Sequence, residues 1–354
     1  MKGLIKSTVI ALAMVGCVNT GFASLEDCLN ATKQNDEHKT INLCKPYVDS
    51  NPKVNAILST SYWLLHQYDS AISYGENFLN DYAGKSNLDA DTQASVAGIY
   101  MELGNIYYFG QGGNKNIQKG LEYITKGAEL GNATAQDQLG NFYAIQGEYP
   151  AQNIPLSYQW SILAEQNGEG SKLSDFDVFS KKYPYCIALG QDNVGQAYYQ
   201  GIGGLEQSNS EALDWMQKAA DTDPTLSVVN LDLAKMYHIN GDDDKAFEYA
   251  QKAISQPLAQ AMQYLGTLYQ QGAGTDKDPV KAYAYLTLAV DLYNNPDTDF
   301  WNKFAAPCMP NYQGTTKEFN VDVAKQQLGE ISLNDEQKEQ ANKIVEQVKA
   351  KFTE

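Results

Sequence analysis

The chain has 354 residues, of which 43% are hydrophobic and 19% are charged, so its composition is that of a folded protein and not of a disordered one. Its formal net charge is −17, and all 26 basic residues are lysine. This balance argues against nucleic acid as a partner, because nucleic-acid-binding proteins need a basic surface. The absence of arginine also excludes bidentate guanidinium contacts to phosphate or carboxylate groups.

Residues 1–23 have the pattern of a secretory signal peptide. Two lysines precede a short apolar run from Thr8 to Val15, and the small residues Gly21 and Ala23 precede a cleavage site at Ser24. The apolar run is too short to span a membrane, and no later run is long enough. We therefore expect an exported protein that is periplasmic or associated with the outer membrane.

A second cleavage signal lies inside the same segment. Met14-Val15-Gly16-Cys17 resembles a bacterial lipobox, in which the cysteine is lipidated. Methionine is uncommon at the first lipobox position, which favours soluble cleavage. A lipid anchor at Cys17 is the alternative.

Residues 24–95 predict helical hairpins and contain two of the four remaining cysteines. Cys28 and Cys44 lie almost symmetrically about a polar turn, so a hairpin would place them opposite each other and allow a disulfide. An even number of cysteines in an exported chain favours disulfides, and the spacings do not fit a zinc site. Cys186 and Cys308 either pair with each other or remain buried free thiols.

An internal repeat follows. Three stretches align in register from Leu103, Val194 and Leu265, and two weaker copies start at Leu139 and Leu233. Each copy has two parts separated by a loop. The first part is Leu or Val, a small residue, two variable residues and Tyr. The second part is small-x-x-aromatic-x-x-x-small. Offsets of three and four place these residues on one helical face. Each copy therefore predicts a helix A, a loop and a helix B, with small residues where the helices approach and an aromatic ring between them.

The pattern resembles the Sel1-like repeat, a relative of the tetratricopeptide repeat, over residues 96–294. The G-x-G loops that begin at Gly110, Gly201 and Gly272 match the loop of that family. Such a turn before a helix can also bind phosphate, but no strand precedes these loops and no Walker lysine-serine follows them. The resemblance implies an all-α fold, a right-handed α-solenoid of helix-turn-helix repeats.

The flanks of the array depart from this pattern. Residues 24–95 are similar to tetratricopeptide units, an insertion is expected near 168–185, and residues 295–354 predict a loop-rich connector and a C-terminal capping helix. Ser332 and Asp335 suggest the N-cap pair of that helix, and a short coiled-coil partner helix is the alternative reading. Its apolar stripe consists of Ala341, Ile344, Val345, Val348 and Phe352.

No constellation of catalytic residues stands out in the sequence. The histidines His38, His66 and His238 lie in different units without metal-ligand spacing, and no G-x-S-x-G elbow appears. The aspartates at 242–244 lack the spacing and glycine of a calcium loop. We expect no catalytic residues, no metal site and no cofactor.

The resemblance implies a non-enzymatic protein–protein interaction scaffold of the bacterial cell envelope, which supports host interaction or virulence. Its partners would be envelope proteins and not nucleic acid, and the chain itself would have no transmembrane span. The alternative is a peptidoglycan-acting envelope enzyme or a direct regulator of one.

Two positions of each helix A are candidates for protein binding, because in tetratricopeptide-type units they face the concave groove. Amide side chains carry both donors and acceptors for a peptide backbone, and an ordinary polar solvent face is the alternative. The positions after the small residue are Asn105, Asn141, Gln196, Lys235 and Thr267. The positions after the tyrosine are Tyr108, Ala144, Tyr199, His238 and Gln270.

The cleavage prediction can be tested by mass spectrometry of the mature protein. We expect Ser24 at its N-terminus, because the small residues at 21 and 23 fit the signal peptidase site. A diacylglyceryl mass on Cys17 would contradict soluble cleavage and establish the lipid anchor.

Overall fold

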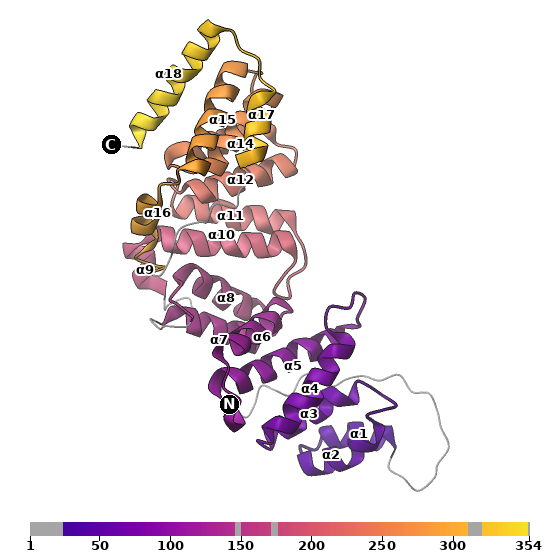
Figure 1. The fold of residues 1–354 in the computed structure, drawn as a ribbon. Helices are drawn as coiled ribbons and strands as arrows, with labels where there is room; N and C mark the ends of the chain where they lie inside the picture. Colours follow the sequence, from indigo (N-terminus) through magenta and orange to yellow (C-terminus); the bar gives the residue numbers. More distant parts are fainter. Residues whose placement is uncertain (1–23, 146–149, 171–175, 311–320, 353–354) are drawn as a thin grey trace. The chain divides into compact units, whose positions relative to one another are not determined.

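The computed structural model describes residues 24–145, 150–170, 176–310 and 321–352, and every regular element in these ranges is a helix. The helices are numbered in chain order in Figure 1. The all-α repeat prediction is confirmed. The signal peptide and Cys17 lie outside the described residues.

The chain divides into two compact units. The first extends to Phe142 and includes Trp160–Ser171 and Ile202–Leu205, and the second contains the rest. The helices up to the boundary are α1 (Leu25–Thr32), α2 (Glu37–Cys44), η2 (Lys45–Tyr47), α3 (Val54–Leu64), α4 (Tyr68–Tyr82), α5 (Ala90–Phe109), η3 (Gln111–Gly113), α6 (Ile117–Glu129) and α7 (Ala133–Ala144). The helix α8 (Ile154–Gln166) contributes residues to both units.

The second unit continues the same alternation. Its helices are α9 (Asp177–Lys182), α10 (Pro184–Gln200), α11 (Asn209–Thr222), α12 (Ser227–Ile239), α13 (Asp243–Lys252), η5 (Ala253–Ser255), α14 (Ala259–Gln271), α15 (Pro279–Asn294), α16 (Thr298–Ala305), α17 (Val321–Gly329) and α18 (Asp335–Lys351). The stretch 168–185, which was expected as an insertion, contains α9, while residues 171–175 lie outside the described ranges.

Five pairs of consecutive helices pack more extensively than the other pairs of neighbours and form the hairpins of the repeat. They are α3/α4, α5/α6, α10/α11, α12/α13 and α14/α15. The small residue of helix A lies where the two backbones meet. A Cβ atom on Gly104 would lie 2.8 Å from the amide nitrogen of Ile124, and one on Gly195 would lie 3.0 Å from the carbonyl oxygen of Ala212. The first distance is shorter than real Cβ contacts, and the second is tighter than most of them, so a side chain at either position would force its neighbours to move.

Aromatic rings fill the space beside these close approaches. The tyrosine of helix A meets an aromatic residue of helix B, and the pairs bury apolar area that holds the hairpin together. The ring centroids are 5.5 Å apart for Tyr62–Tyr74, 6.0 Å for Tyr107–Tyr123, 5.4 Å for Tyr237–Tyr249 and 5.8 Å for Tyr269–Tyr285.

The G-x-G loops are structural parts of the repeat. Their glycines have positive φ, a conformation that side chains disfavour. In the first unit, Gly203 donates its amide to the carbonyl of Glu129 (2.7 Å), and its carbonyl accepts a 2.9 Å hydrogen bond from Gln136. In the second unit, a Cβ atom on Gly274 would collide with the backbone of Asp243. The second glycine therefore packs against an earlier hairpin.

Two disulfides are present. One is the expected Cys28–Cys44 pair, and the other joins Cys186 to Cys308, one of the two alternatives left open for these cysteines. Cys28 and Cys44 join α1 to α2 with their Cα atoms 4.8 Å apart. Cys186 of α10 is joined to Cys308, which follows α16, with the Cα atoms 5.8 Å apart. All four cysteines are completely buried. The first bridge closes the N-terminal hairpin, and the second ties the connector after α15 to the array.

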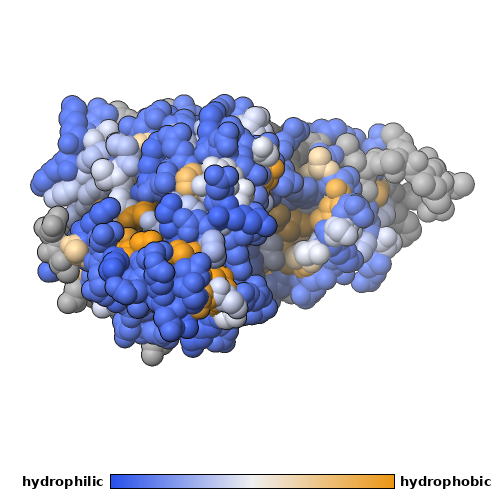
Figure 2. Space-filling view, turned by 90° about the horizontal axis from the view of Figure 1, so that it is seen from above, coloured by the Kyte–Doolittle hydropathy of each residue, from blue (hydrophilic) through white to orange (hydrophobic). Residues whose placement is uncertain are grey.

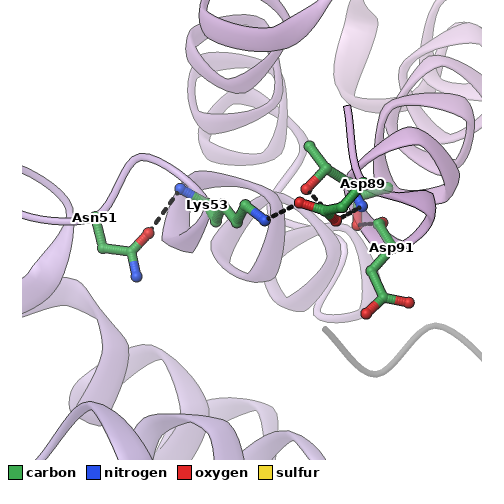
Figure 3. A network of polar contacts seen from close by, with 6 residues as sticks. Asn51, Lys53, Asp89 and Asp91 are labelled. Atoms are coloured by element: carbon green, nitrogen blue, oxygen red, sulfur yellow. Dashed lines mark hydrogen bonds and ion pairs between the residues drawn. The ribbon is translucent and has the colours of Figure 1, made fainter. Parts of the chain in front are cut away.

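A polar network joins the start of α3 to the start of α5 in the first unit (Figure 3). Lys53 Nζ donates to Asp89 Oδ2 (2.9 Å), and Asp89 Oδ1 accepts the amide of Thr92 (2.8 Å) as the N-cap of α5. The amide of Lys53 donates to Asn51 Oδ1 (3.1 Å). The hydrogen bonds from Lys53 and Thr92 lower the pKa of the Asp89 carboxyl. This cap fixes where α5 begins.

The last helix covers the end of the array. Ala341, Val345 and Val348 of α18 are buried in one cluster with residues of α14 and α15. The expected N-cap pair, Ser332 with Asp335, is wrong. Asn334 is the N-cap, and its side chain and that of Gln337 form a reciprocal capping box, with distances of 2.8 and 3.0 Å.

The close approach predicts opposite effects for two glycines of α5. Gly104→Ala should lower the free energy of unfolding by about 1–3 kcal/mol, because its Cβ has no room. Gly98→Ala should raise it by about 0.5–1 kcal/mol, because a Cβ there meets nothing within 4 Å and alanine favours the helix. Urea unfolding of both variants tests this. Equal effects would contradict the role of Gly104.

Candidate protein-binding surface

The candidate residues that follow the small position are largely engaged within the chain. Asn105 is only 6% exposed, and its Nδ2 lies 3.1 Å from Met101 Sδ while its Oδ1 has no hydrogen-bond partner. The expected exposed position is therefore wrong for Asn105. Lys235 is half-buried and forms an ion pair with Asp232 (2.9 Å).

Thr267 is contacted by a later helix of the same unit. Gln327 of α17 donates to Thr267 Oγ1 (3.1 Å) and accepts from Gln263 Nε2 (2.9 Å), and Tyr293 donates to Gln263 Oε1 (2.7 Å). The groove position expected at Thr267 is thus covered by the chain itself. Sequence reasoning missed this helix, although Leu328-Gly329 repeats the leucine-glycine pair that marks a helix A.

The same contact recurs in the first unit. Thr60 occupies the position after the small residue of α3, and its Oγ1 donates to the carboxylate of Glu102 on α5 at 2.9 and 3.1 Å. Glu102 immediately precedes the leucine of its repeat, as Gln327 does. At these two positions the residue after the small residue contacts the next helix A. We call polar contacts between successive A helices, including that of Asp192 in α10 with Asp232 in α12, the inter-repeat ladder.

The ladder contains buried acids. Glu102 is 4% exposed, and burial raises its pKa to about 8, although the hydrogen bond from Thr60 opposes this shift. In the second unit Asp192 is also 4% exposed. Burial raises its pKa, the charge of Asp232 raises it further, and Lys235 acts in the opposite direction. These helix contacts therefore favour neutral carboxyl groups at their centres.

The remaining candidates are accessible to different extents. Asn141, Ala144 and His238 are exposed, while Gln196, Tyr108, Tyr199 and Gln270 are half-buried. Asn141 donates to Asp137 (3.1 Å), and His238 Nδ1 lies 2.5 Å from Asp243 Oδ1. Tyr108 stacks on Phe142 of α7 with ring centroids 4.4 Å apart. Each unit therefore offers part of this set to a partner.

A second accessible position was not predicted. Large apolar side chains are exposed two residues after the tyrosine of four A helices, with exposed fractions of 42%, 56%, 63% and 48% for Leu64, Phe109, Ile145 and Ile239. Figure 2 shows apolar groups among the hydrophilic atoms of the face it draws. The repeat register contains this signal, because all four residues lie at the same distance from the tyrosine of helix A.

The described ranges hold no cluster of three or more histidine, cysteine or acidic side chains placed to bind a metal ion. None of the helices within them combines the length and apolar character of a membrane span. A shallow polar hollow of about 480 Å³ is lined by the turn from Asn240 to Asp244. This turn precedes and caps α13 through Asp242.

Comparison with known proteins agrees with the repeat geometry. The Sel1 repeat family model matches residues 100–132, 188–222, 231–258 and 259–294. Chitin synthase regulatory factor 1 of Schizosaccharomyces pombe is 29% identical over 163 residues, which are 44% of this chain and 35% of that protein. The chain thus matches about a third of that relative's length.

Two solved structures match the chain at low identity. One is c5321, a protective antigen of uropathogenic Escherichia coli with an SLR fold, at 20% identity and a TM-score of 0.36, covering 92% of this chain and 63% of that one. The other is a Sel1 repeat protein from Oxalobacter formigenes, at 20% identity and a TM-score of 0.32, covering 79% and 98%.

The raised pKa of Glu102 predicts a pH-dependent stability. Between pH 4.5 and 8 the unfolded chain releases this proton while the folded chain retains it, so the free energy of unfolding falls as pH rises. Glu102→Gln should remove this loss. The free energy of unfolding of this variant, relative to that of the wild type, should therefore rise by roughly 2–3 kcal/mol between pH 5 and pH 7.5.

Urea unfolding of the wild type and Glu102→Gln at both pH values measures this difference. Glu122→Gln is the matched control, because Glu122 is an exposed glutamate on α6 that pairs with Lys126. The same pH dependence in all three proteins would contradict a neutral Glu102 in the folded state.

Proposed function

We propose that this chain, which belongs to the Sel1-repeat family, is a non-enzymatic scaffold that holds protein partners at the bacterial cell envelope. Sel1 repeat proteins are generally protein-interaction scaffolds. The observation that carries the proposal is the repeated helix A, which offers accessible side chains at the same repeat position in successive hairpins, such as Tyr199 in α10 and His238 in α12. A repeated surface of this kind suits an extended partner.

The cellular location in this proposal rests on the cysteines and the N-terminal sequence. Two buried disulfides are compatible with an oxidising compartment, such as the periplasm. The signal peptide pattern supports export. A role in host interaction or virulence is proposed from the family resemblance.

The partner contacts are proposed for the accessible A-helix residues. Asn141, Gln196 and His238 have polar groups that could bind a partner without disturbing the core, because they are exposed or half-buried. We leave out Asn105 because it is buried, and Thr267 because α17 contacts it.

A cross-linking pull-down from isolated envelopes tests the scaffold. The combined variant Asn141→Ala, Gln196→Ala and His238→Ala should keep its helical circular dichroism and lose at least about 80% of the captured partner, since a few central contacts dominate most interfaces. The matched control replaces Gln118 and Gln251 by alanine, which are exposed glutamines on the B helices α6 and α13.

The controls separate the possible outcomes. Loss of partner in the A-helix variant alone supports the proposal, and equal capture by both variants moves the binding surface elsewhere. A parallel screen against purified muropeptides addresses the alternative function. Binding or cleavage of muropeptides without any captured protein would replace the scaffold by a peptidoglycan enzyme or regulator.

A further inference from the structure

The exposed apolar residues of the described chain are not scattered. Six large hydrophobic side chains are exposed there, and four of them occupy one repeat position, two residues after the tyrosine of helix A. We call these four the apolar row. Its members are Leu64, Phe109, Ile145 and Ile239. The other two exposed hydrophobics, Val178 and Val323, lie on α9 and α17.

The fold does not require apolar side chains at this position. The corresponding residues of α10 and α14 are Gln200 and Gln271, and both are exposed. A polar residue therefore fits the end of helix A, so packing does not explain a phenylalanine, a leucine and two isoleucines in the other helices. Apolar groups that recur at one exposed position favour an interaction site.

In the first unit one member of the row, Phe109, is part of a larger aromatic group. Phe109 is 56% exposed, and its ring centroid lies 5.1 Å from that of Tyr108 and 6.3 Å from that of Phe142. Aromatic rings provide large contact areas with little loss of conformational entropy, so this group offers an anchor for an apolar side chain.

In the second unit one member of the row, Ile239, is followed by three aspartates. Ile239 directly precedes the turn that lines the polar hollow. Asp242 lies 3.6 Å from Lys245, and Asp243 contacts His238, but the exposed Asp244 forms no ion pair or hydrogen bond within the described ranges. The whole chain carries a net charge of −17. Attraction therefore favours a cationic partner and disfavours an anionic membrane.

We propose that the apolar row is a docking surface for a cationic amphipathic segment of a partner protein, in which leucine-like side chains alternate with lysine or arginine. This inference rests on the proposed scaffold function and specifies the chemistry of its partner. Each unit binds through its own members of the row, Leu64 and Phe109 in the first and Ile145 and Ile239 in the second.

Fluorescence anisotropy with a labelled 16-residue peptide of leucine and lysine tests the proposal. Two double variants should each weaken binding at their own unit about ten-fold, as expected for the loss of central apolar contacts. They are Leu64→Ser with Phe109→Ser in the first unit and Ile145→Ser with Ile239→Ser in the second. Val178→Ser with Val323→Ser is the matched control and should leave binding unchanged, because these exposed hydrophobics lie outside the row.

Two altered peptides test the chemistry of the segment. Replacing its lysines by glutamate, or its leucines by serine, should weaken binding to the wild type at least about ten-fold. Asp244→Asn should weaken binding of the lysine peptide and reduce its dependence on salt, because one exposed charge is removed.

Equal binding by the row and control variants would overturn the proposal, and so would equal binding of the glutamate peptide. Sedimentation that shows a dimer lost in the row variants would assign the surface to a second copy, and row-dependent binding to phosphatidylglycerol vesicles would assign it to lipid.

In the envelope pull-down, a partner captured equally by row and control variants would refute this inference and leave the scaffold intact. The absence of any captured protein would refute the scaffold itself.

Discussion

The close approach of helix A and helix B is the constraint on which the rest of the structure depends. Gly104 and Gly266 leave no room for a Cβ atom beside the facing helix. Where α3 has Ser59 at the small position, Gly75 of α4 supplies the space instead, and Ser59 Oγ donates to the carbonyl of Ala71 (2.9 Å). The tyrosine pairs and the glycine-capped loops follow from this spacing, because they fit only between helices at that distance.

The sequence predicts what is local to a hairpin and misses what depends on the next one. The repeat of small residues and tyrosines sufficed for the helices and the cysteine hairpin, because each rests on contacts within one hairpin. The loops were predicted from their glycines, which adopt positive φ, but not their packing against an earlier hairpin. The contact between Thr267 and Gln327 depends on a later helix, and the 6% exposure of Asn105 could not be predicted from its place in the repeat. Exposure of Phe109 was missed for a related reason, since hydrophobicity alone does not say which side chains remain uncovered.

The inter-repeat ladder places polar groups where an apolar contact would also pack. Glu102 and Asp192 are buried with raised pKa values, so each favours the neutral acid over a buried charge. The hydrogen bond from Thr60 to Glu102 requires one alignment of α3 and α5, whereas apolar side chains would let one helix slide along the other. We therefore infer that the ladder contributes to the register between successive A helices more than to stability.

The face of helix A is thus divided along its length. Its middle is committed to the neighbouring helix, as Thr60 and Thr267 show. Its C-terminal end stays accessible, because the loop turns away at a glycine or a short turn directly after Phe109 and Ile239. A partner that binds several repeats must therefore contact the ends of the A helices and their loops. Since neither the close approach nor the ladder constrains the side chains there, the end of helix A is the part of the repeat that can vary with the partner.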